Sequence, residues 1–491
     1  PDVPDVPDVP DVPDVPDVPS APQSSAGMGG DIKFSGFAAF DWYQYFVEVG
    51  DRAPDGAKAV GGVAQIRLAP RLQATYRSLR AVAEVEFRHD FLDPGRANRF
   101  ILREAAIGFR YRGLHVEGGA LLPRWGKMDV DSPSDNLVAR DYEEFLFPDP
   151  LPVPAVSVGW SGGPFSVTGL LIPAFVPSRY RNTEPSRWNN TWFLPRTETV
   201  PTGIVGDYVF TNRYGPFVDA VAEGGGSPLL RGVEAGVRAD LYLRALDLGL
   251  SFATVRDRLP TWTSFEVTNT NVVDGVADYL QNQQVDLEIT PHHERLYVPA
   301  VDMALSVWRL VLKGEAAYFH TQDPDHDDCL IDDPYVKYAV GAELVLPDLL
   351  GPVDLAVRVQ YNGDVEIPRE GDDILNQERG CKVFSIADPD QGLTLTDRET
   401  GQTGTPAIRH PYSHAWYWNL NLAFSDSFSL DLRGFADVSQ DALIWADLSY
   451  RLLDTIEFHL GALVMLSTGE DTVFTPYGNN HRLEVGLRYR F

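Results

Sequence analysis

The sequence predicts a transmembrane antiparallel β-barrel of about 18 strands, with 16 strands as the other count that the pattern allows. Three observations lead to this fold class. Segments of alternating apolar and polar residues recur along the chain, the connections between them alternate between short and long, and the chain ends in a strand-like segment that closes on Phe491. The fold class is therefore all-β.

The last ten residues give the clearest strand signal. Their side chains repeat with a period of two, which places successive residues on opposite faces of a strand. A polar face that mixes glycine with charges of both signs suits a water-filled lumen, with lipid on the other side of the wall. Leu483, Val485, Leu487, Tyr489 and Phe491 share the apolar face, whereas Arg482, Glu484, Gly486, Arg488 and Arg490 share the polar face.

The same alternation recurs in roughly eighteen segments, which is the basis of the strand count. Barrels with that many strands enclose an aqueous channel, because their interior is too wide for side chains to fill. The expected strands begin near Asp31, Val63, Leu79, Phe100, Leu114, Pro154, Pro164, Gly232, Ala245, Arg295, Leu310, Tyr335, Val353, Ser413, Phe428, Asp441, Thr455 and His481.

The connections predict which side of the membrane each end of the barrel faces. Short turns alternate with long loops, with one short exception near Ser439, as expected for short periplasmic turns and long extracellular loops. An even strand number places both termini on the periplasmic side. Aromatic residues such as Trp416, Trp418, Tyr361, Tyr450 and Tyr489 are expected at the membrane interfaces. The long connections cover about 50–62, 90–99, 123–153, 175–231, 256–294, 321–334, 363–412 and 467–480.

The final strand resembles the terminal strand of Gram-negative outer-membrane barrels, whose last aromatic residue serves as an assembly signal in that family. A second stretch contains Trp125-Gly126, Asp129, Pro133-x-Asp135 and Arg140-Asp141-Tyr142. It is similar to a stretch in a widespread, poorly characterised family of large porin-like outer-membrane proteins, as is the segment 172–178. The resemblance implies an outer-membrane location, contacts with lipid and lipopolysaccharide, and help from the barrel assembly machinery during biogenesis.

Composition excludes several other classes of protein. The 491 residues carry a formal net charge of −29, which argues against a nucleic-acid partner because phosphates would be repelled. Two cysteines are too few for a disulfide scaffold. No apolar run reaches the ~18 residues that a transmembrane helix needs. Three acidic segments outside the expected strands, 1–30, 321–334 and 363–400, hold −18 of this charge.

We expect two regions in the chain. Residues 1–30 form a disordered periplasmic tail and linker, of which residues 1–18 are six copies of Pro-Asp-Val. Proline at every third position excludes helix and sheet. This repeat is either a passive spacer or a docking arm for a periplasmic partner. Residues 31–491 form the barrel as one membrane domain.

The loop at 123–150 is the candidate pore constriction. Basic and acidic side chains close together in it would set an electric field across a pore and select solutes by charge and orientation. A turn or short helix within 132–144 would carry part of it into the lumen, and the alternative is an ordinary salt-bridged external loop. The candidate constriction residues are Arg124, Trp125, Lys127, Asp129, Asp135, Arg140 and Asp141.

Charged residues at inward strand positions are the second candidate site. They form either a polar permeation path or a lattice of salt bridges between strands, and both arrangements need a wet interior. The candidate lumen-lining residues are Arg88, Glu104, Glu117, Arg238, Arg358, Arg433, Glu484 and Arg488.

Two further candidates lie in long loops. Cys329 and Cys381 are expected to form a disulfide in an oxidising compartment. Asp323, Asp325 and Asp327 either bind Ca²⁺ or belong to a solvated acidic loop, and no other cofactor is expected. The string Gly159-Trp160-Ser161-Gly162-Gly163 falls at a hairpin turn rather than a strand-to-helix turn, so we expect no enzyme.

These observations predict a porin-like channel for the passive diffusion of small hydrophilic solutes through a water-filled lumen narrowed by an infolded loop. Two alternatives stay open at this point. One is an export conduit for a polysaccharide that works with periplasmic partners, and the other is a surface scaffold or adhesin without transport.

Overall fold

The structure is a computed structural model, and most of its described residues belong to β-strands. The described residues are 30–46, 61–92, 98–142, 148–180, 197–201, 207–214, 232–258, 260–267, 272–273, 276–277, 284–322, 334–349, 351–367, 382–385, 394–396, 414–438, 441–467, 477–478 and 480–491. Within this part of the chain, no helix is both long enough and apolar enough to cross a membrane.

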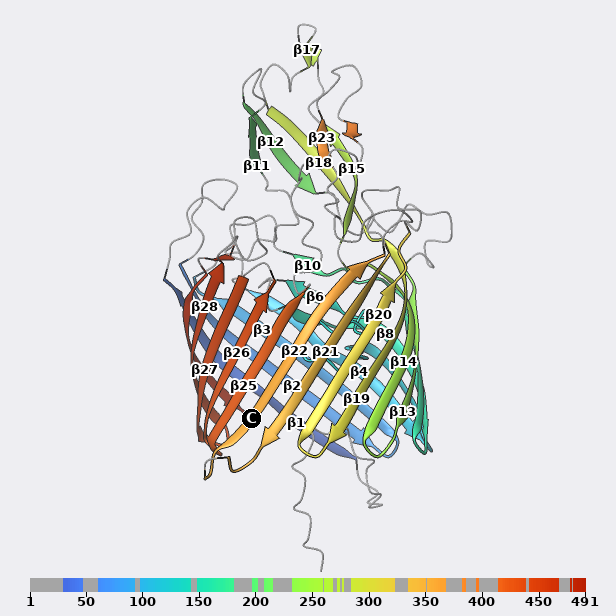
Figure 1. Ribbon diagram of the computed structural model, residues 1–491, viewed down its shortest axis with the longest axis vertical. Helices are drawn as coiled ribbons and strands as arrows, with labels where there is room; N and C mark the ends of the chain where they lie inside the picture. The colour runs from blue at the N-terminus through green and yellow to red at the C-terminus, as the bar shows by residue number, and fades with distance from the viewer. Residues whose placement is uncertain are drawn as a thin grey trace, which may run out of the picture.

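Eighteen antiparallel strands form one closed barrel (Figure 1). Each strand pairs with the next along the chain, and β1 also pairs with β29, which closes the wall. The predicted fold class is therefore confirmed, and every strand begins within two residues of its predicted start. The strands are β1 (Asp31–Tyr45), β2 (Gly62–Tyr76), β3 (Leu79–Asp90), β4 (Arg99–Tyr111), β5 (Leu114–Leu121), β8 (Val153–Gly162), β9 (Phe165–Ile172), β13 (Glu234–Tyr242), β14 (Leu246–Arg256), β19 (Arg295–Val307), β20 (Leu310–Phe319), β21 (Tyr335–Leu346), β22 (Asp354–Glu366), β25 (Ala415–Ser425), β26 (Phe428–Asp437), β27 (Asp441–Leu453), β28 (Ile456–Ser467) and β29 (Arg482–Arg490).

The two faces of the wall differ in chemistry. Large apolar side chains such as Ile107, Leu250 and Val301 are exposed on the outer face. Charged side chains at the alternate positions form ion pairs with neighbouring strands, as between Arg71 and Glu84 at 2.7 Å. An apolar outside and a charged inside are the reverse of a soluble barrel and fit a wall that separates lipid from water.

Aromatic side chains gather at both ends of the barrel. At the end of the long connections, the Tyr361 and Trp416 rings lie 4.9 Å apart. At the end of the short turns, Phe491 lies 5.5 Å from Phe34 and 6.2 Å from Tyr489. Two aromatic belts separated by aliphatic side chains are typical of the two interfaces of a bilayer.

The regions predicted as long connections contain short strands that the sequence analysis did not identify. β6 (Ala139–Tyr142), β7 (Asp149–Leu151) and β10 (Arg179–Tyr180) form a small sheet at the mouth of the barrel, and the other strands lie beyond it (Figure 1). β10 has only two residues, too few to show a period, and β12 (Asp207–Tyr214) pairs with β18 (Gln284–His292), which is distant in sequence. The outer strands are β11 (Thr197–Pro201), β12 (Asp207–Tyr214), β15 (Thr261–Val267), β18 (Gln284–His292), β16 (Val272–Val273), β17 (Val276–Ala277), β23 (Lys382–Ser385) and β24 (Thr394–Thr396).

Candidate functional site

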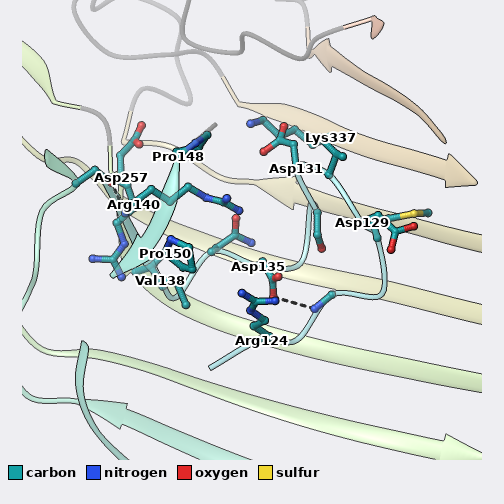
Figure 2. A pocket seen from close by; sticks show the side chains of 18 of the residues that line it. Arg124, Asp129, Asp131, Asp135, Val138, Arg140, Pro148, Pro150, Asp257 and Lys337 are labelled. Carbon is teal, nitrogen blue, oxygen red and sulfur yellow. Dashed lines mark hydrogen bonds between the residues drawn. The ribbon is translucent and has the colours of Figure 1, made fainter. Parts of the chain in front are cut away.

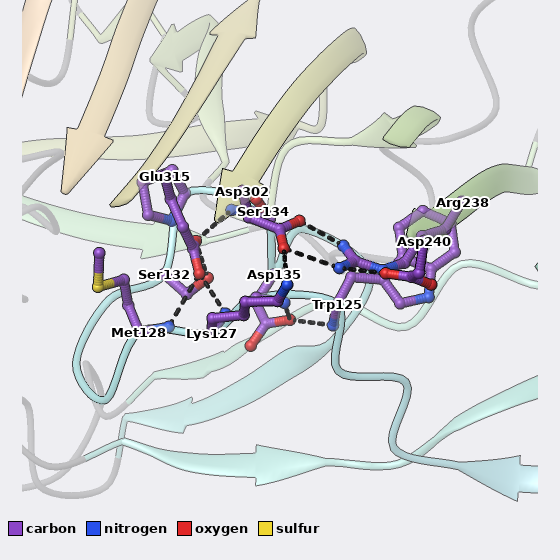
Figure 3. Close-up of polar contacts among 12 residues, drawn as sticks. Trp125, Lys127, Met128, Ser132, Ser134, Asp135, Arg238, Asp240, Asp302 and Glu315 are labelled. Carbon is purple, nitrogen blue, oxygen red and sulfur yellow. Dashed lines mark hydrogen bonds and ion pairs between the residues drawn. The ribbon is translucent and has the colours of Figure 1, made fainter. Parts of the chain in front are cut away.

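Residues 122–138, here called the inner loop, leave the end of β5 and contact the inner face of the wall (Figure 3). Glu315 on β20 is the main anchor. Its carboxylate accepts hydrogen bonds from the backbone N–H groups of Lys127 and Met128, the latter at 2.8 Å. The Ser132 hydroxyl donates to it at 2.5 Å, and the Ser134 N–H at 3.4 Å. One wall side chain therefore satisfies both ends of the turn at 127–134.

The inner loop also holds its own shape. The Asp135 carboxylate accepts hydrogen bonds from the N–H groups of Trp125 at 2.6 Å and Gly126 at 2.9 Å. The Trp125 ring is buried against Gly236 on β13, where a Cβ atom would come within 2.4 Å of it. Asp135 therefore fixes the backbone, and Trp125 fixes the loop to the wall.

A buried chain of charges continues from the inner loop into the wall. The Lys127 ammonium lies 3.0 Å from the carboxylate of Asp302 on β19. Arg238 donates two hydrogen bonds to Asp302, at 2.6 and 2.9 Å, and another to Asp240 at 2.7 Å. The Asp302 side chain is fully buried, so its charge depends on these cations rather than on water.

The next strands along the wall hold residues 129 and 130. The Gln360 side chain on β22 accepts hydrogen bonds from the Asp129 N–H at 3.1 Å and the Val130 N–H at 3.2 Å. The Asn362 amide donates to the Val130 carbonyl at 3.2 Å. The Lys313 ammonium lies 3.3 Å from the Asp129 carboxylate. The inner loop thus runs across strands from β13 to β22.

The small sheet that follows makes contacts on other sides of the barrel. Ala139 belongs to a buried apolar cluster with residues of β8, β9, β14 and β19, whereas Tyr142 packs against a cluster from β25 to β28. Burial raises the pKa of Tyr142 to about 12, so its hydroxyl stays neutral. On β7, burial raises the pKa of Asp149, but Arg88 at 2.8 Å and Arg103 at 3.2 Å outweigh it and hold that pKa below its usual range.

Arg258 and Glu234 connect the inner loop to the neighbouring connections. The two side chains form an ion pair at 2.9 Å in which the Glu234 side chain is fully buried. Arg258 also donates to the Leu137 carbonyl at 3.1 Å and the Val176 carbonyl at 3.0 Å. The bases of three connections are therefore joined through one guanidinium.

A cavity of about 570 Å³ lies beside the inner loop (Figure 2). Its lining is largely charged and polar, and it draws on the inner loop, the small sheet and the opposite wall. Arg124 and Asp129 are exposed side chains of the loop that line it. Further charged lining residues are Lys127, Asp131, Asp135, Arg140, Arg256, Asp257, Arg258, Lys337 and Arg433.

The structure places the candidate constriction residues in different surroundings. Arg124 and Asp129 line the cavity, and Lys127 lines it while pairing with Asp302 in the wall. Trp125 is buried, and Asp135 binds backbone amides of its own loop. The Arg140 N–H donates to the Ser178 hydroxyl at 3.0 Å, and Asp141 stands opposite Arg179 in the pairing of β6 with β10.

The candidate lumen-lining residues lie mostly in ion pairs between neighbouring side chains of the inner face. Their contacts are Arg88 with Glu86, Glu104 with Arg71 at 3.1 Å, Arg238 with Asp302 at 2.6 Å, Arg358 with Glu343 at 2.9 Å, Arg433 with Asp431 at 2.7 Å, Glu484 with Arg482 at 2.5 Å, and Arg488 with the Phe37 ring at 5.3 Å; Glu117 is also at an inward position.

Sequence reasoning missed the wall residues that hold the inner loop, namely Asp302, Glu315 and Gln360. Each lies at an inward position of a strand and is buried. The signal was present for Asp302, the only charge between Leu296 and Val307, because a charge inside an apolar strand needs a partner. Nothing in the sequence identifies that partner.

Several predicted sites lie outside the described residues. These are the Cys329–Cys381 pair, the acidic group of Asp323, Asp325 and Asp327, and the Pro-Asp-Val repeat. Within the described part of the chain, no group of three or more His, Cys, Asp or Glu side chains is arranged to hold a metal ion.

We expect Gly236→Val to release the inner loop, because a side chain at this position overlaps the Trp125 ring. Limited trypsin digestion followed by mass spectrometry measures the release as faster cleavage after Arg124 and Lys127. Gly169→Val is the matched control, since a Cβ atom there meets only a carbonyl at 3.8 Å. If Gly236→Val and Gly169→Val are cleaved at equal rates after Arg124 and Lys127, the packing of Trp125 against Gly236 does not hold the loop.

Comparison with known proteins found no matching family model and no matching curated protein. Solved structures with similar backbones include the outer membrane protein OpdK from Pseudomonas aeruginosa, at 10% identity and a TM-score of 0.44, over 94% of this chain and 98% of that chain. Another is Salmonella typhi OmpF in complex with daunomycin, at 10% identity and a TM-score of 0.38, over 94% of this chain and 97% of that chain. A third is a triple mutant of Rhodopseudomonas blastica porin, at 11% identity and a TM-score of 0.37, over 94% of this chain and 100% of that chain. These similarities are too low to transfer a function.

Proposed function

We propose that this chain is an outer-membrane, porin-like channel through which small hydrophilic solutes diffuse passively. The barrel sits in the membrane with its short turns and both termini on the periplasmic side, and the inner loop narrows the lumen. One observation carries the proposal: a charged segment on the inner face of an 18-stranded wall leaves a polar cavity of about 570 Å³ beside it. A cavity of this size suits a small solute rather than a folded protein.

The charges on this path support selection by charge. Arg124 is exposed in the cavity lining and makes no ion pair within the described part of the chain. Asp129 is exposed nearby, and its charge is shared with Lys313 at 3.3 Å. A cation and an anion at separate places on a narrow path orient dipolar solutes and discriminate between ions, because few water molecules remain to screen them.

Planar-bilayer recording of the purified full-length chain tests the proposal. We expect stable open conductance in symmetric salt, without any added partner. A polymer exporter or a surface scaffold would stay closed in the same experiment. If neither the intact chain nor a variant that lacks residues 123–150 conducts ions, the proposed channel function is wrong.

We expect Arg124→Glu to shift the reversal potential in a salt gradient toward cation selectivity. The substitution replaces a positive charge in the cavity lining, which forms no ion pair among the described residues, with a negative one. Arg124→Gln removes the charge without reversing it, so it should give a shift of the same sign and roughly half the size, since it makes half the charge change. Identical reversal potentials in all three proteins would exclude Arg124 from the ion path.

A further inference from the structure

The short turns of the barrel fall into two sectors around its circumference, and the turn charges within each sector have one sign. Following the strand order from β2 to β20, four of the five turns carry an arginine at or beside the turn. The next three turns, after β21, β25 and β27, each carry an aspartate. The turn arginines are Arg77, Arg112, Arg244 and Arg309, and the turn aspartates are Asp348, Asp426 and Asp454.

Three turn arginines lie on an aromatic ring of the residue before them. The guanidinium of Arg77 is 5.3 Å from the centre of the Tyr76 ring, and Arg112 is 5.3 Å from the ring of Tyr111. Arg309 is 5.1 Å from the ring of Trp308. These rings are largely exposed, with Trp308 at 82%. They belong to the aromatic belt at the short-turn end of the barrel, where side chains of this type meet lipid headgroups.

Among the described residues, no carboxylate neutralises the turn arginines. All four are exposed, and within the described part of the chain none of them forms an ion pair. The backbone supports this arrangement, because Arg77 and Arg112 have φ of 54° and 45°, a left-handed conformation that closes a tight turn. A planar guanidinium with free donors binds a phosphate through two hydrogen bonds.

We propose that the turn arginines form a binding surface for the phosphate groups of anionic phospholipids in the membrane leaflet at the short-turn end. The surface covers the sector of the wall from β2 to β20. The sector of the turn aspartates repels the same headgroups. The barrel therefore carries an asymmetric ring of anionic lipid, which lies outside the proposed solute path and is independent of it.

The acidic repeat of residues 1–18 is the competing occupant. It carries six aspartates, and β1 begins at the same end of the barrel. The lipid is favoured because the guanidinium groups stack on rings that face the membrane at headgroup level. A headgroup is held at that level by the bilayer itself, so it needs no additional ordering of the chain.

Thermal unfolding of the full-length chain in detergent, with added short-chain phosphatidylglycerol or phosphatidylcholine, tests the proposal. We expect phosphatidylglycerol to raise the Tm of the wild type more than phosphatidylcholine does, because a ligand that binds only the folded state stabilises it. The variant R77Q/R112Q/R244Q/R309Q should lose this difference. Its affinity for phosphatidylglycerol should fall at least about tenfold, since each basic residue contributes to attraction at an anionic surface.

The variant D348N/D426N/D454N is the matched control, and it should keep the preference for phosphatidylglycerol. Circular dichroism checks that both variants retain the barrel. Deletion of residues 1–30 should leave the preference unchanged. A full preference in the arginine variant would overturn the proposal. A preference that appears only after the deletion would also overturn it, since the acidic repeat would then be the occupant.

Discussion

Replacing Glu315 with alanine is expected to release the inner loop and increase the single-channel conductance. Glu315 accepts four hydrogen bonds from this loop, and no other wall residue receives as many from it among the described residues. A hydrogen bond to a charged group is worth about 1.5–3 kcal/mol. Since about 1.4 kcal/mol changes an equilibrium tenfold, losing even two of these bonds should shift the loop strongly toward the undocked state.

Planar-bilayer recording is the measurement, and the expected result is a larger and noisier open current. Glu315→Gln keeps a side-chain carbonyl that can accept some of the bonds, so it should give an intermediate conductance. Glu117→Gln removes a carboxylate from an inward position on β5, away from the loop contacts, and serves as the control. If Glu315→Ala and Glu117→Gln conduct alike, Glu315 does not hold the loop.

Replacing Asp302 with asparagine is expected to destabilise the barrel by about 3–5 kcal/mol, the cost of breaking a buried ion pair by removing one partner. Asp302 balances Lys127 at 3.0 Å and Arg238 at 2.6 Å, and its side chain is fully buried. Without the Asp302 charge, Lys127 loses its carboxylate partner, and among the described residues Arg238 keeps Asp240 alone.

Urea unfolding in lipid vesicles, followed by far-ultraviolet circular dichroism, measures this loss as a lower midpoint. Asp247→Asn removes a carboxylate from an inward position of the adjacent strand β14 that makes no ion pair within the described residues, and it should cost below about 1 kcal/mol. Adding Lys127→Met to Asp302→Asn should recover part of the stability, because the ammonium that lost its carboxylate is then absent and Arg238 keeps its ion pair with Asp240. If Asp302→Asn has the same urea midpoint as Asp247→Asn, the buried ion pairs of Asp302 do not stabilise the barrel.

Most of the wall was predictable because each strand meets two different solvents. Lipid on one side and water on the other force a period of two, so Leu483, Val485 and Leu487 alone reveal the orientation of β29. This rule is local, and it therefore located all eighteen strand starts within two residues. Short strands such as β10 carry no comparable signal, because two residues contain no period.

The residues that line the candidate site were only partly predictable. The mixture of Arg124, Lys127 and Asp129 between two strands pointed to residues 123–150. Their surroundings were not predictable, since Lys127 pairs with Asp302 and Asp135 binds the amides of its own loop. Some of the charges predicted for the constriction therefore anchor the inner loop, whereas others are exposed to the cavity.

By itself, the sequence determined that the chain forms a closed wall with an apolar outer face and a charged inner face. Only the tertiary structure decided which inner-face residues hold the inner loop. The contacts of Glu315 with Lys127 and of Gln360 with Val130 join residues more than 180 positions apart in the chain. Alternation fixes the face on which a side chain lies, but partners across a lumen depend on closure of the barrel, which no local pattern encodes.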